Sequence, residues 1–406
     1  MIAAGTPAFR RLTLAMLFAG FSTFSLLYSV QPLLPVFATE FALDAETASL
    51  AVSLATGPLA IGILFAGALS DRIGRRPMMV WAMFLAGLFT LLAAALPGWG
   101  ALLACRLVTG VALAGVPAVA MAYVSEEVDA ASVGRAMGLY IGGSAIGGMA
   151  GRLGVSLLTA WMDWRVALAA VGVAGLAMAE AFRRLAPPSR GFVASRPGMA
   201  AFLAGARSLL ADRALPWLYL EAFVLMGVFV TVYNYAGFRL LAPPYALDHA
   251  EVGAIFLLYL TGSWSSAWFG TLAGRRGRRV IFWLPCLLLL AGVALTALSP
   301  LPLVIAGIAA VTIGFFGAHS IASAWVGRRA EANRGQGAAL YLFFYYLGSS
   351  VLGSAGGVAW THGGWHGVAL LCGALTLVAV GVALHLRRVP PLASAEAPAP
   401  RPLGSD

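Results

Sequence analysis

The chain has 406 residues, of which 61% are hydrophobic and only 10% are charged, whereas soluble domains contain about 25% charged residues. The 26 basic residues are all arginine and give a net charge of +10. Because these arginines lie in short segments between long apolar runs, we set aside a nucleic-acid-binding protein and predict a polytopic membrane protein.

Six membrane helices are predicted in the first part of the chain. Uncharged runs between turn residues place them at about 12–38, 47–70, 78–97, 99–124, 135–160 and 164–182. Arg10 and Arg11 are followed by 28 uncharged residues through Thr39, a run too long for the apolar core of a cleaved signal peptide. We therefore expect the first helix to remain in the protein.

A group of charged residues separates the second and third predicted helices, in the segment Gly67-Ala68-Leu69-Ser70-Asp71-Arg72-Ile73-Gly74-Arg75-Arg76. Asp71 would end a helix, where its charge opposes the helix dipole and requires a cationic partner or a helix N-terminus. Gly74 permits the chain to reverse, and the arginines hold the loop in the cytoplasm. The segment is interpreted either as a gating contact or as a basic turn that only fixes the topology.

A degenerate copy of this loop begins 203 residues later, at Gly270-Thr271-Leu272-Ala273-Gly274-Arg275-Arg276-Gly277-Arg278-Arg279, with Gly274 in place of the acid. The pair resembles the signature loop of the major facilitator superfamily. The resemblance implies gating by Gly67, Asp71, Arg72, Gly74, Arg75 and Arg76, and by Arg275, Gly277 and Arg278 in the copy. It also implies that Asp71 docks near Arg334 and Gly335 when the protein is open outward.

Two arginines lie inside apolar segments, where an ionisable group costs free energy and is a functional hypothesis by default. Arg106 opens Arg106-Leu107-Val108-Thr109-Gly110, which resembles the helix 4 motif of the superfamily and implies a role in proton coupling. With Arg152 in the same leaflet, it could bind an anionic substrate or pair with Gln31, tyrosine or backbone oxygens. The alternatives are a snorkelling Arg106 and a packing or gating contact of Arg152.

Glycines recur along the fifth predicted helix, at positions 138, 142, 143, 147, 148 and 151. Small residues allow helices to approach closely, so Gly143, Gly147 and Gly148 are predicted to pack against a neighbouring helix. The segment Gly143 to Gly148 also resembles the helix 5 motif of drug-proton antiporters, although Ser144 stands where that motif has proline. This departure weakens an assignment to drug export.

A connector at 183–213 contains Pro187, Pro188 and Pro197. Within it, apolar residues recur at helical spacing opposite Arg207 and Asp212, which predicts an interfacial helix; the alternative is a solvated linker. The apolar residues are Met199, Phe202, Leu203, Ala206, Leu209 and Leu210. Six further membrane helices are predicted at about 214–242, 249–274, 279–299, 301–327, 335–361 and 365–386.

The charge distribution and an internal repeat complete the predicted architecture. All but four of the 26 arginines fall on one side of this layout, which predicts cytoplasmic termini. The segment GRAMGLY at 134–140 matches GQGAALY at 335–341, an offset of 201 residues. We therefore predict an all-α protein with twelve transmembrane helices in two pseudo-repeated bundles, 1–182 and 214–388, with the linker 183–213 and a disordered cytoplasmic tail at 389–406.

Polar residues in the helices that line the cavity of the superfamily are candidates for substrate binding: Tyr28, Gln31, Arg106, Arg152, Tyr233, Asn234, His319, Tyr341 and Tyr345. Each tyrosine could instead belong to an interfacial belt, and the histidine could be a packing residue. Glu221 and Arg106 are the two candidates for proton coupling. The alternative for Glu221 is an acid that is hydrated at the inner rim or paired with Arg183, Arg184 or Arg213.

The sequence contains no GxSxG, HExxH, CxxC or phosphate-loop motif, and Cys105, Cys286 and Cys372 each stand alone. We therefore predict no enzyme, metal site or cofactor. The predicted function is a monomeric secondary transporter of the inner membrane that moves a small organic solute, possible anions included, by alternating access with protons as coupling ion. The alternatives are proton-driven efflux of lipophilic drugs or sugars and a non-transporting receptor or scaffold.

Overall fold

The computed structural model describes residues 1–189, 191 and 199–390, and this part of the chain is built of helices. Eleven of them are long and apolar enough to span a membrane. The longest, α16 (Arg334–Arg388), counts once among these although Gly364 interrupts it with φ 53° and ψ −144°. Divided at this kink, the described helices supply twelve spans, and the all-α prediction is confirmed. The predicted tail from residue 391 onward lies outside the described residues.

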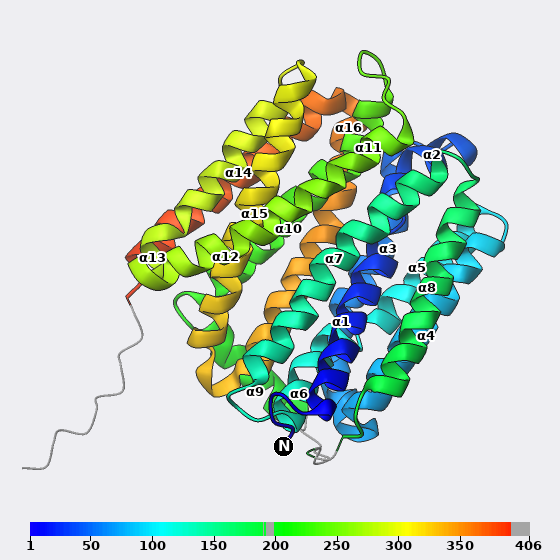
Figure 1. The fold of residues 1–406 in the computed structure, drawn as a ribbon. Coiled ribbons are helices and arrows are strands. Elements are labelled where there is room, and N and C mark those ends of the chain that lie inside the picture. Colours follow the sequence, from blue (N-terminus) through cyan, green and yellow to red (C-terminus); the bar gives the residue numbers. More distant parts are fainter. Residues whose placement is uncertain (190, 192–198, 391–406) are drawn as a thin grey trace, which may run out of the picture.

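The first half of the fold, which we call the N-half, comprises α1 to α8 (Figure 1). Its elements are α1 (Pro7–Tyr28), the 3₁₀ helix η1 (Gln31–Leu33), α2 (Leu34–Glu40), α3 (Ala45–Ile73), α4 (Arg75–Ala95), α5 (Trp99–Leu113), α6 (Pro117–Glu127), α7 (Val133–Thr159) and α8 (Trp164–Leu185).

The second half, which we call the C-half, comprises α10 to α16. Its elements are α10 (Leu215–Leu241), α11 (His249–Ala254), the 3₁₀ helix η2 (Ile255–Leu258), α12 (Tyr259–Arg276), α13 (Arg278–Ile281), α14 (Trp283–Thr296), α15 (Leu301–Arg329), the 3₁₀ helix η3 (Glu331–Asn333) and α16. The connecting segment contributes α9 (Met199–Leu210).

Several predicted spans are interrupted rather than continuous. Proline lacks a backbone N–H and cannot continue the hydrogen-bond ladder of a helix. Pro32 and Pro35 accordingly divide the first span into α1, η1 and α2, and Pro117 begins α6 after a break in the fourth span. The spans predicted at 12–38 and 99–124 are therefore present, as Pro7–Glu40 and Trp99–Glu127, but the helix is interrupted inside each of them.

The two signature loops reverse the chain in the same way. Gly74 ends α3 with φ 94°, and Gly277 ends α12 with φ 91°. Side chains strain the backbone in this left-handed region, which glycine adopts freely. The local conformation of the loop is therefore repeated in the two halves, although only the first copy carries an acid.

The two halves pack against each other along two pairs of helices. Helix α3 lies along α16, and α7 lies against the short α11 (Figure 1). We call the end of the bundle with the loops 72–76 and 275–279 the basic end. Hydrogen bonds between membrane helices of the two halves include those of Tyr28, Gln31, Ser53 and Ser350, which lie in the middle of the bundle or toward its opposite end.

The glycines of α7 lie against α1. A Cβ atom added at Gly143 would stand 2.3 Å from the carbonyl oxygen of Leu17, and one at Gly147 would stand 2.2 Å from that of Phe21. Neither contact leaves room for a side chain, so the backbones of the two helices meet directly. At Gly148 the nearest atom is Nη1 of Arg152, at 3.2 Å.

A helix does form in the connector where the apolar spacing predicted one, and it contacts the C-half. In α9 the backbone oxygen of Phe202 accepts a hydrogen bond from Gln336 at 2.6 Å, and Leu209 is buried. Asp212 follows α9 and forms an ion pair with Arg329 at 2.5 Å. These contacts fix α9 to the ends of α15 and α16.

Candidate functional site

Arg152 lies where the two halves meet. Its side chain is buried, its Nε donates to Oε1 of Gln31 at 2.5 Å, and its Nη1 donates to the carbonyl of Gly148 at 2.5 Å. The guanidinium carbon stands 4.4 Å from the ring centre of Tyr28 and 5.0 Å from that of Tyr259. Aromatic faces attract cations, so rings from both halves stabilise this charge.

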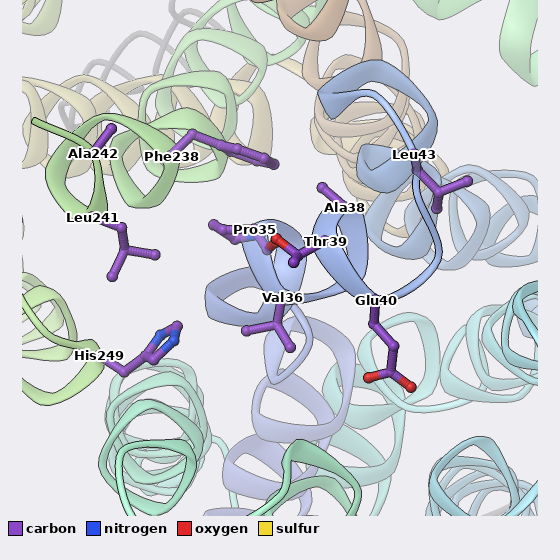
Figure 2. A pocket seen from close by; sticks show the side chains of 10 residues that line it. All are labelled: Pro35, Val36, Ala38, Thr39, Glu40, Leu43, Phe238, Leu241, Ala242 and His249. Atoms are coloured by element: carbon purple, nitrogen blue, oxygen red, sulfur yellow. The ribbon is translucent and has the colours of Figure 1, made fainter.

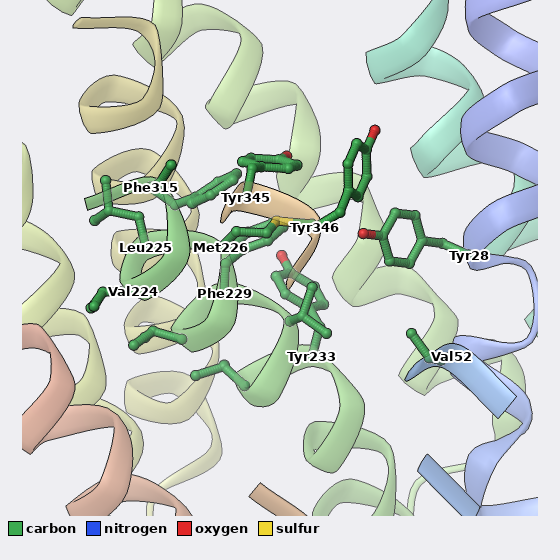
Figure 3. Close-up of a cluster of buried hydrophobic side chains, with 14 of the residues drawn as sticks. Tyr28, Val52, Val224, Leu225, Met226, Phe229, Tyr233, Phe315, Tyr345 and Tyr346 are labelled. Carbon is green, nitrogen blue, oxygen red and sulfur yellow. The ribbon is translucent and has the colours of Figure 1, made fainter. Parts of the chain in front are cut away.

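The partners of Arg152 continue across the interface. Nε2 of Gln31 donates to Oδ1 of Asn234 at 2.7 Å, while the hydroxyls of Tyr28 and Ser349 lie 3.2 Å apart. The break between α1 and η1 brings Tyr28 and Gln31 to this position. Figure 3 shows Tyr28 pointing from the N-half toward Tyr346 and Tyr233 of the C-half. The expected alternative, that Arg152 pairs with Gln31, tyrosine or backbone oxygens, agrees with these contacts.

This group contains positive charge and unused polar atoms but no described acid in contact. No ion pair of Arg152 occurs within the described residues, and Nδ2 of Asn234 and the hydroxyl of Tyr259 are buried there without a hydrogen-bond partner. Burying such groups unpaired costs free energy. A ligand with a carboxylate or carbonyl oxygen could satisfy both.

Arg106 lies inside the N-half and is fully buried. Its Nε donates to the carbonyl of Ala51 at 2.8 Å, its Nη1 to that of Leu26 at 3.0 Å, and its Nη2 to that of Leu27. The snorkelling alternative is therefore wrong. Arg106 and Arg152 bind neighbouring parts of one segment, residues 26–31, rather than each other.

Ser53 adds a contact between the halves that the sequence did not indicate. Its hydroxyl lies 2.7 Å from that of Ser354 and donates to the carbonyl of Ser350 at 3.1 Å, while the hydroxyl of Ser350 donates back to the carbonyl of Ser53 at 3.0 Å. Tyr233 likewise has an unpredicted partner, because its hydroxyl lies 2.8 Å from Oγ1 of Thr312.

A second polar cluster lies in the C-half, nearer the basic end. Glu221 is buried, and neither of its carboxyl oxygens has a hydrogen-bond partner within the part of the chain that the structure describes. Tyr341 and Cys286 are near enough to interact with it electrostatically. The Tyr341 hydroxyl lies 3.0 Å from Nδ1 of His319, whose ring centre is 4.9 Å from that of Tyr345.

The proposed alternatives for Glu221 do not match this placement. A hydrated position at the rim is excluded by burial, and Arg183 and Arg184 instead bind Glu180 at 2.6 Å each. A partner for Glu221 was expected because a lone acid is costly inside a membrane. In the described part of the chain its neighbours are Tyr341 and Cys286, and neither carboxyl oxygen has a hydrogen-bond partner.

The first signature loop forms a closed network at the basic end. Arg75 contacts Asp71 at 2.6 Å and Glu126 at 2.9 Å, and Arg76 donates to the carbonyls of Ala186 and Arg183. Sequence reasoning missed Glu126, whose position near the end of α6 was the available signal. In this conformation the charged partner of Asp71 is Arg75, whereas Arg334 binds Glu331 at 3.0 Å.

The remaining gating candidates lie near the end of α3, at the end of α12 and in the turn that follows α12. A Cβ atom at Gly67 would meet nothing within 4 Å. Arg72, Arg275 and Gly277 are exposed, and Arg278 is half-buried.

A separate pocket lies between the halves at the end opposite the basic loops. Its volume is about 680 Å³, and it is mostly apolar, lined by Pro35, Val36, Ala38, Thr39, Glu40, Leu43, Phe238, Leu241, Ala242 and His249 (Figure 2). Glu40 accepts hydrogen bonds there from Trp164 and Arg165. None of the residues predicted to bind substrate lines this pocket.

Twelve helical spans, repeated glycine-arginine loops and a polar site between the halves define a multi-pass membrane transporter. The sequence matches the Major Facilitator Superfamily over residues 14–249 and 227–405, so the chain belongs to this family. It is 46% identical over 390 residues to the inner membrane transport protein YnfM of Escherichia coli K12, covering 94% of this chain and 92% of that protein.

Two further likenesses agree with this assignment. The uncharacterized MFS-type transporter YybF of Bacillus subtilis 168 is 42% identical over 384 residues, which cover 95% of both chains. The fold also resembles the crystal structure of a bacterial homologue of the human lysosomal transporter Spinster in an inward-facing, unoccupied conformation. That likeness has a TM-score of 0.75 at 15% identity and covers 95% of this chain and 98% of the other.

Proposed function

We propose that this protein is a secondary active transporter that carries a small organic anion by alternating access, with Arg152 in its substrate site. The observation that supports this most is the buried Arg152 guanidinium, which contacts side chains of both halves and no described acid. Arginine offers a planar fork of donors that matches a carboxylate. A substrate anion would complete the charge balance of this site.

Alternating access requires contacts at one end of the bundle to break while contacts at the other end form. The hydrogen bonds from Ser53, Tyr28 and Gln31 join the halves in the middle and toward the opposite end. If the basic end is cytoplasmic, as the arginine distribution predicts, these contacts would have to break when the transporter opens outward. Asp71 would then exchange Arg75 for the end of α16 in the outward-facing state.

Glu221 is the proposed proton-coupling residue. Its carboxyl group is buried without a partner, and an ionised carboxylate is costly in such surroundings. A conformational change that hydrates this group would let it exchange a proton with water. The proton and the substrate would then be bound in different places, which couples them through the movement of the halves rather than by direct contact.

Proteoliposome uptake tests the substrate proposal. Carboxylates would be compared with their neutral amides, with and without a pH gradient, in the wild type, Arg152→Lys, Arg152→Ala and the control Arg165→Gln, whose ion pair with Glu40 lies away from Arg152. We expect carboxylates to be preferred and Arg152→Lys to lose about 10- to 100-fold in affinity, since one charged hydrogen bond contributes about 1.5–3 kcal/mol. Equal transport of acids and amides, with full activity in both Arg152 variants, would contradict the proposal.

Efflux of lipophilic compounds is the second candidate. The aromatic side chains around His319, including Phe315, Tyr341 and Tyr345, favour it, because they form a largely apolar cluster in which Tyr341 lies near enough to Glu221 to interact with it electrostatically. In that case Arg152→Ala would retain transport of neutral lipophilic compounds, whereas Glu221→Gln would lose its dependence on the pH gradient.

A further inference from the structure

Helix α12 has one face that packs on the protein and another that does not. A Cβ atom at Gly262 would lie 2.4 Å from Phe316 of α15, and Oγ of Ser265 donates to the carbonyl of Ile313 at 2.6 Å. Tyr259 turns toward Arg152. On the other side, Trp264 and Trp268 are 60% and 47% exposed. At 100° per residue around the helix axis, these tryptophans lie roughly 140° to 180° from Tyr259. They therefore face the membrane rather than the contact between the N-half and the C-half.

The two tryptophans form one flat apolar surface. Their ring centres are 5.9 Å apart and their planes differ by 14°. Arg275 lies seven residues after Trp268 on the same helix face, so the rings stand about 10 and 16 Å along the axis from it. Exposed tryptophan normally collects at the interface of the bilayer. These rings lie deeper, at the depth of a lipid acyl chain.

Positive charge without described counter-ions lies at the headgroup end of this surface. Arg275 and Arg276 are exposed, and Arg278 follows across the turn at Gly277, near enough to Arg328 for their like charges to interact. Within the residues that the structure describes, none of the four forms an ion pair. The equivalent loop of the N-half differs, because Asp71 and Glu126 neutralise Arg75 there.

We propose that this face of α12 binds an anionic phospholipid, with its phosphate on Arg275, Arg276 and Arg278 and one acyl chain along Trp264 and Trp268. The loss of the loop acid at Gly274 leaves the arginines available, and a lipid phosphate supplies the missing charge. The tryptophan pair distinguishes such a site from diffuse attraction of a basic loop to the membrane, which needs no particular acyl contact. The proposal does not depend on the identity of the transported solute.

Quenching of tryptophan fluorescence by brominated acyl chains tests this site. The full chain is reconstituted into phosphatidylcholine vesicles that contain a small fraction of either brominated phosphatidylglycerol or brominated phosphatidylcholine. Subtracting the signal of the double variant Trp264→Phe/Trp268→Phe isolates the two rings. We expect brominated phosphatidylglycerol to quench this component at severalfold lower mole fraction than brominated phosphatidylcholine.

Charge variants separate a specific site from general attraction. Arg275→Gln/Arg276→Gln/Arg278→Gln should abolish the preference, because each arginine contributes roughly fivefold to binding an anionic headgroup. The control Arg387→Gln/Arg388→Gln removes exposed charge from the end of α16. This control variant should retain the preference for the anionic lipid. Arg275→Lys, which retains the charge, should fold and keep part of the preference.

Three results would overturn the proposal. Equal quenching by both lipids in the wild type would mean that the tryptophans meet bulk lipid. Equal loss of the preference in the control variant would mean that only diffuse charge acts. Displacement of the quenching by millimolar inorganic phosphate would mean that the arginines bind a free anion rather than a lipid.

Discussion

Replacing Ser53 by alanine tests whether the described contacts between α3 and α16 hold the halves together. The Ser53 hydroxyl takes part in two of them, with the hydroxyl of Ser354 at 2.7 Å and the carbonyl of Ser350 at 3.1 Å. The reciprocal bond from Ser350 to the backbone of Ser53 would remain. A neutral hydrogen bond contributes about 0.5–1.5 kcal/mol net. The substitution should therefore destabilise the described conformation by about 1–2 kcal/mol, without affecting a conformation in which these contacts are broken.

That loss corresponds to a shift of about 5- to 30-fold in the equilibrium between the described conformation and one in which the opposite ends separate. Spin labels at positions 161 and 298, which are exposed in the two halves, would report the separation as a longer distance. The three native cysteines are buried, which limits background labelling.

The control is Thr90→Ala, since the Thr90 hydroxyl is also buried in a membrane helix but bonds only the carbonyl of Ala86 within that helix. Thr90→Ala should leave the distance distribution unchanged. An unchanged distribution in Ser53→Ala, in a protein that still transports, would show that these contacts do not set the conformational equilibrium.

Four further outcomes are expected. Glu221→Gln, which cannot ionise, should abolish accumulation driven by a pH gradient but retain exchange of substrate across the membrane; full gradient-driven accumulation would exclude Glu221 as the coupling site. Asp71→Asn should lower the transport rate and shift the population toward the inward-facing state, whereas Gly274→Ala should have little effect; unchanged distances in the Asn variant would remove the gating role. Burial raises the pKa of Asp212, but hydrogen bonds from Arg329 and from the backbone of Ala214 and Leu215 outweigh it, so the pKa of Asp212 lies below its usual range. The ion pair should therefore stabilise α9 above about pH 4 and lose this effect as the pH falls further. Hydrogen exchange in α9 should become faster at low pH, and Asp212→Asn should show the faster exchange already at neutral pH. Cysteines at positions 73 and 277 should react only with reagents that enter the cell, and labelling by an impermeant reagent in intact cells would reverse the topology.

Features that depend on local sequence were predictable. Long apolar runs located the spans, and Gly74 and Gly277 marked two turns that adopt the same positive φ. The suggestion that Arg152 pairs with Gln31 also agrees with the structure, because few other polar groups were available at that depth.

Features that depend on packing between distant segments were not predictable. Nothing in the serine at position 53 distinguishes it from serines that bond their own helix, such as Ser144, which donates to the carbonyl of Tyr140. The ion pair between Arg75 and Glu126 of α6 could not be predicted either, because it depends on how the loop after α3 folds back against α6. Local breaks were missed for a different reason, since the hydropathy of 12–38 and 99–124 stays high through Pro32 and Pro117.

The contacts of Arg106 change how an effect of its mutation should be understood. A helix leaves its last carbonyl groups without partners and carries partial negative charge at that end. Helix α1 ends at Tyr28, and Arg106 donates to the carbonyls of Leu26 and Leu27 in its final turn. A guanidinium from another helix thus serves as a C-terminal cap in a place where water is scarce. Without it, the turn that presents Tyr28 and Gln31 to Arg152 would lose its anchor. A loss of transport in an Arg106 variant would therefore not by itself place Arg106 in contact with the solute or with a proton.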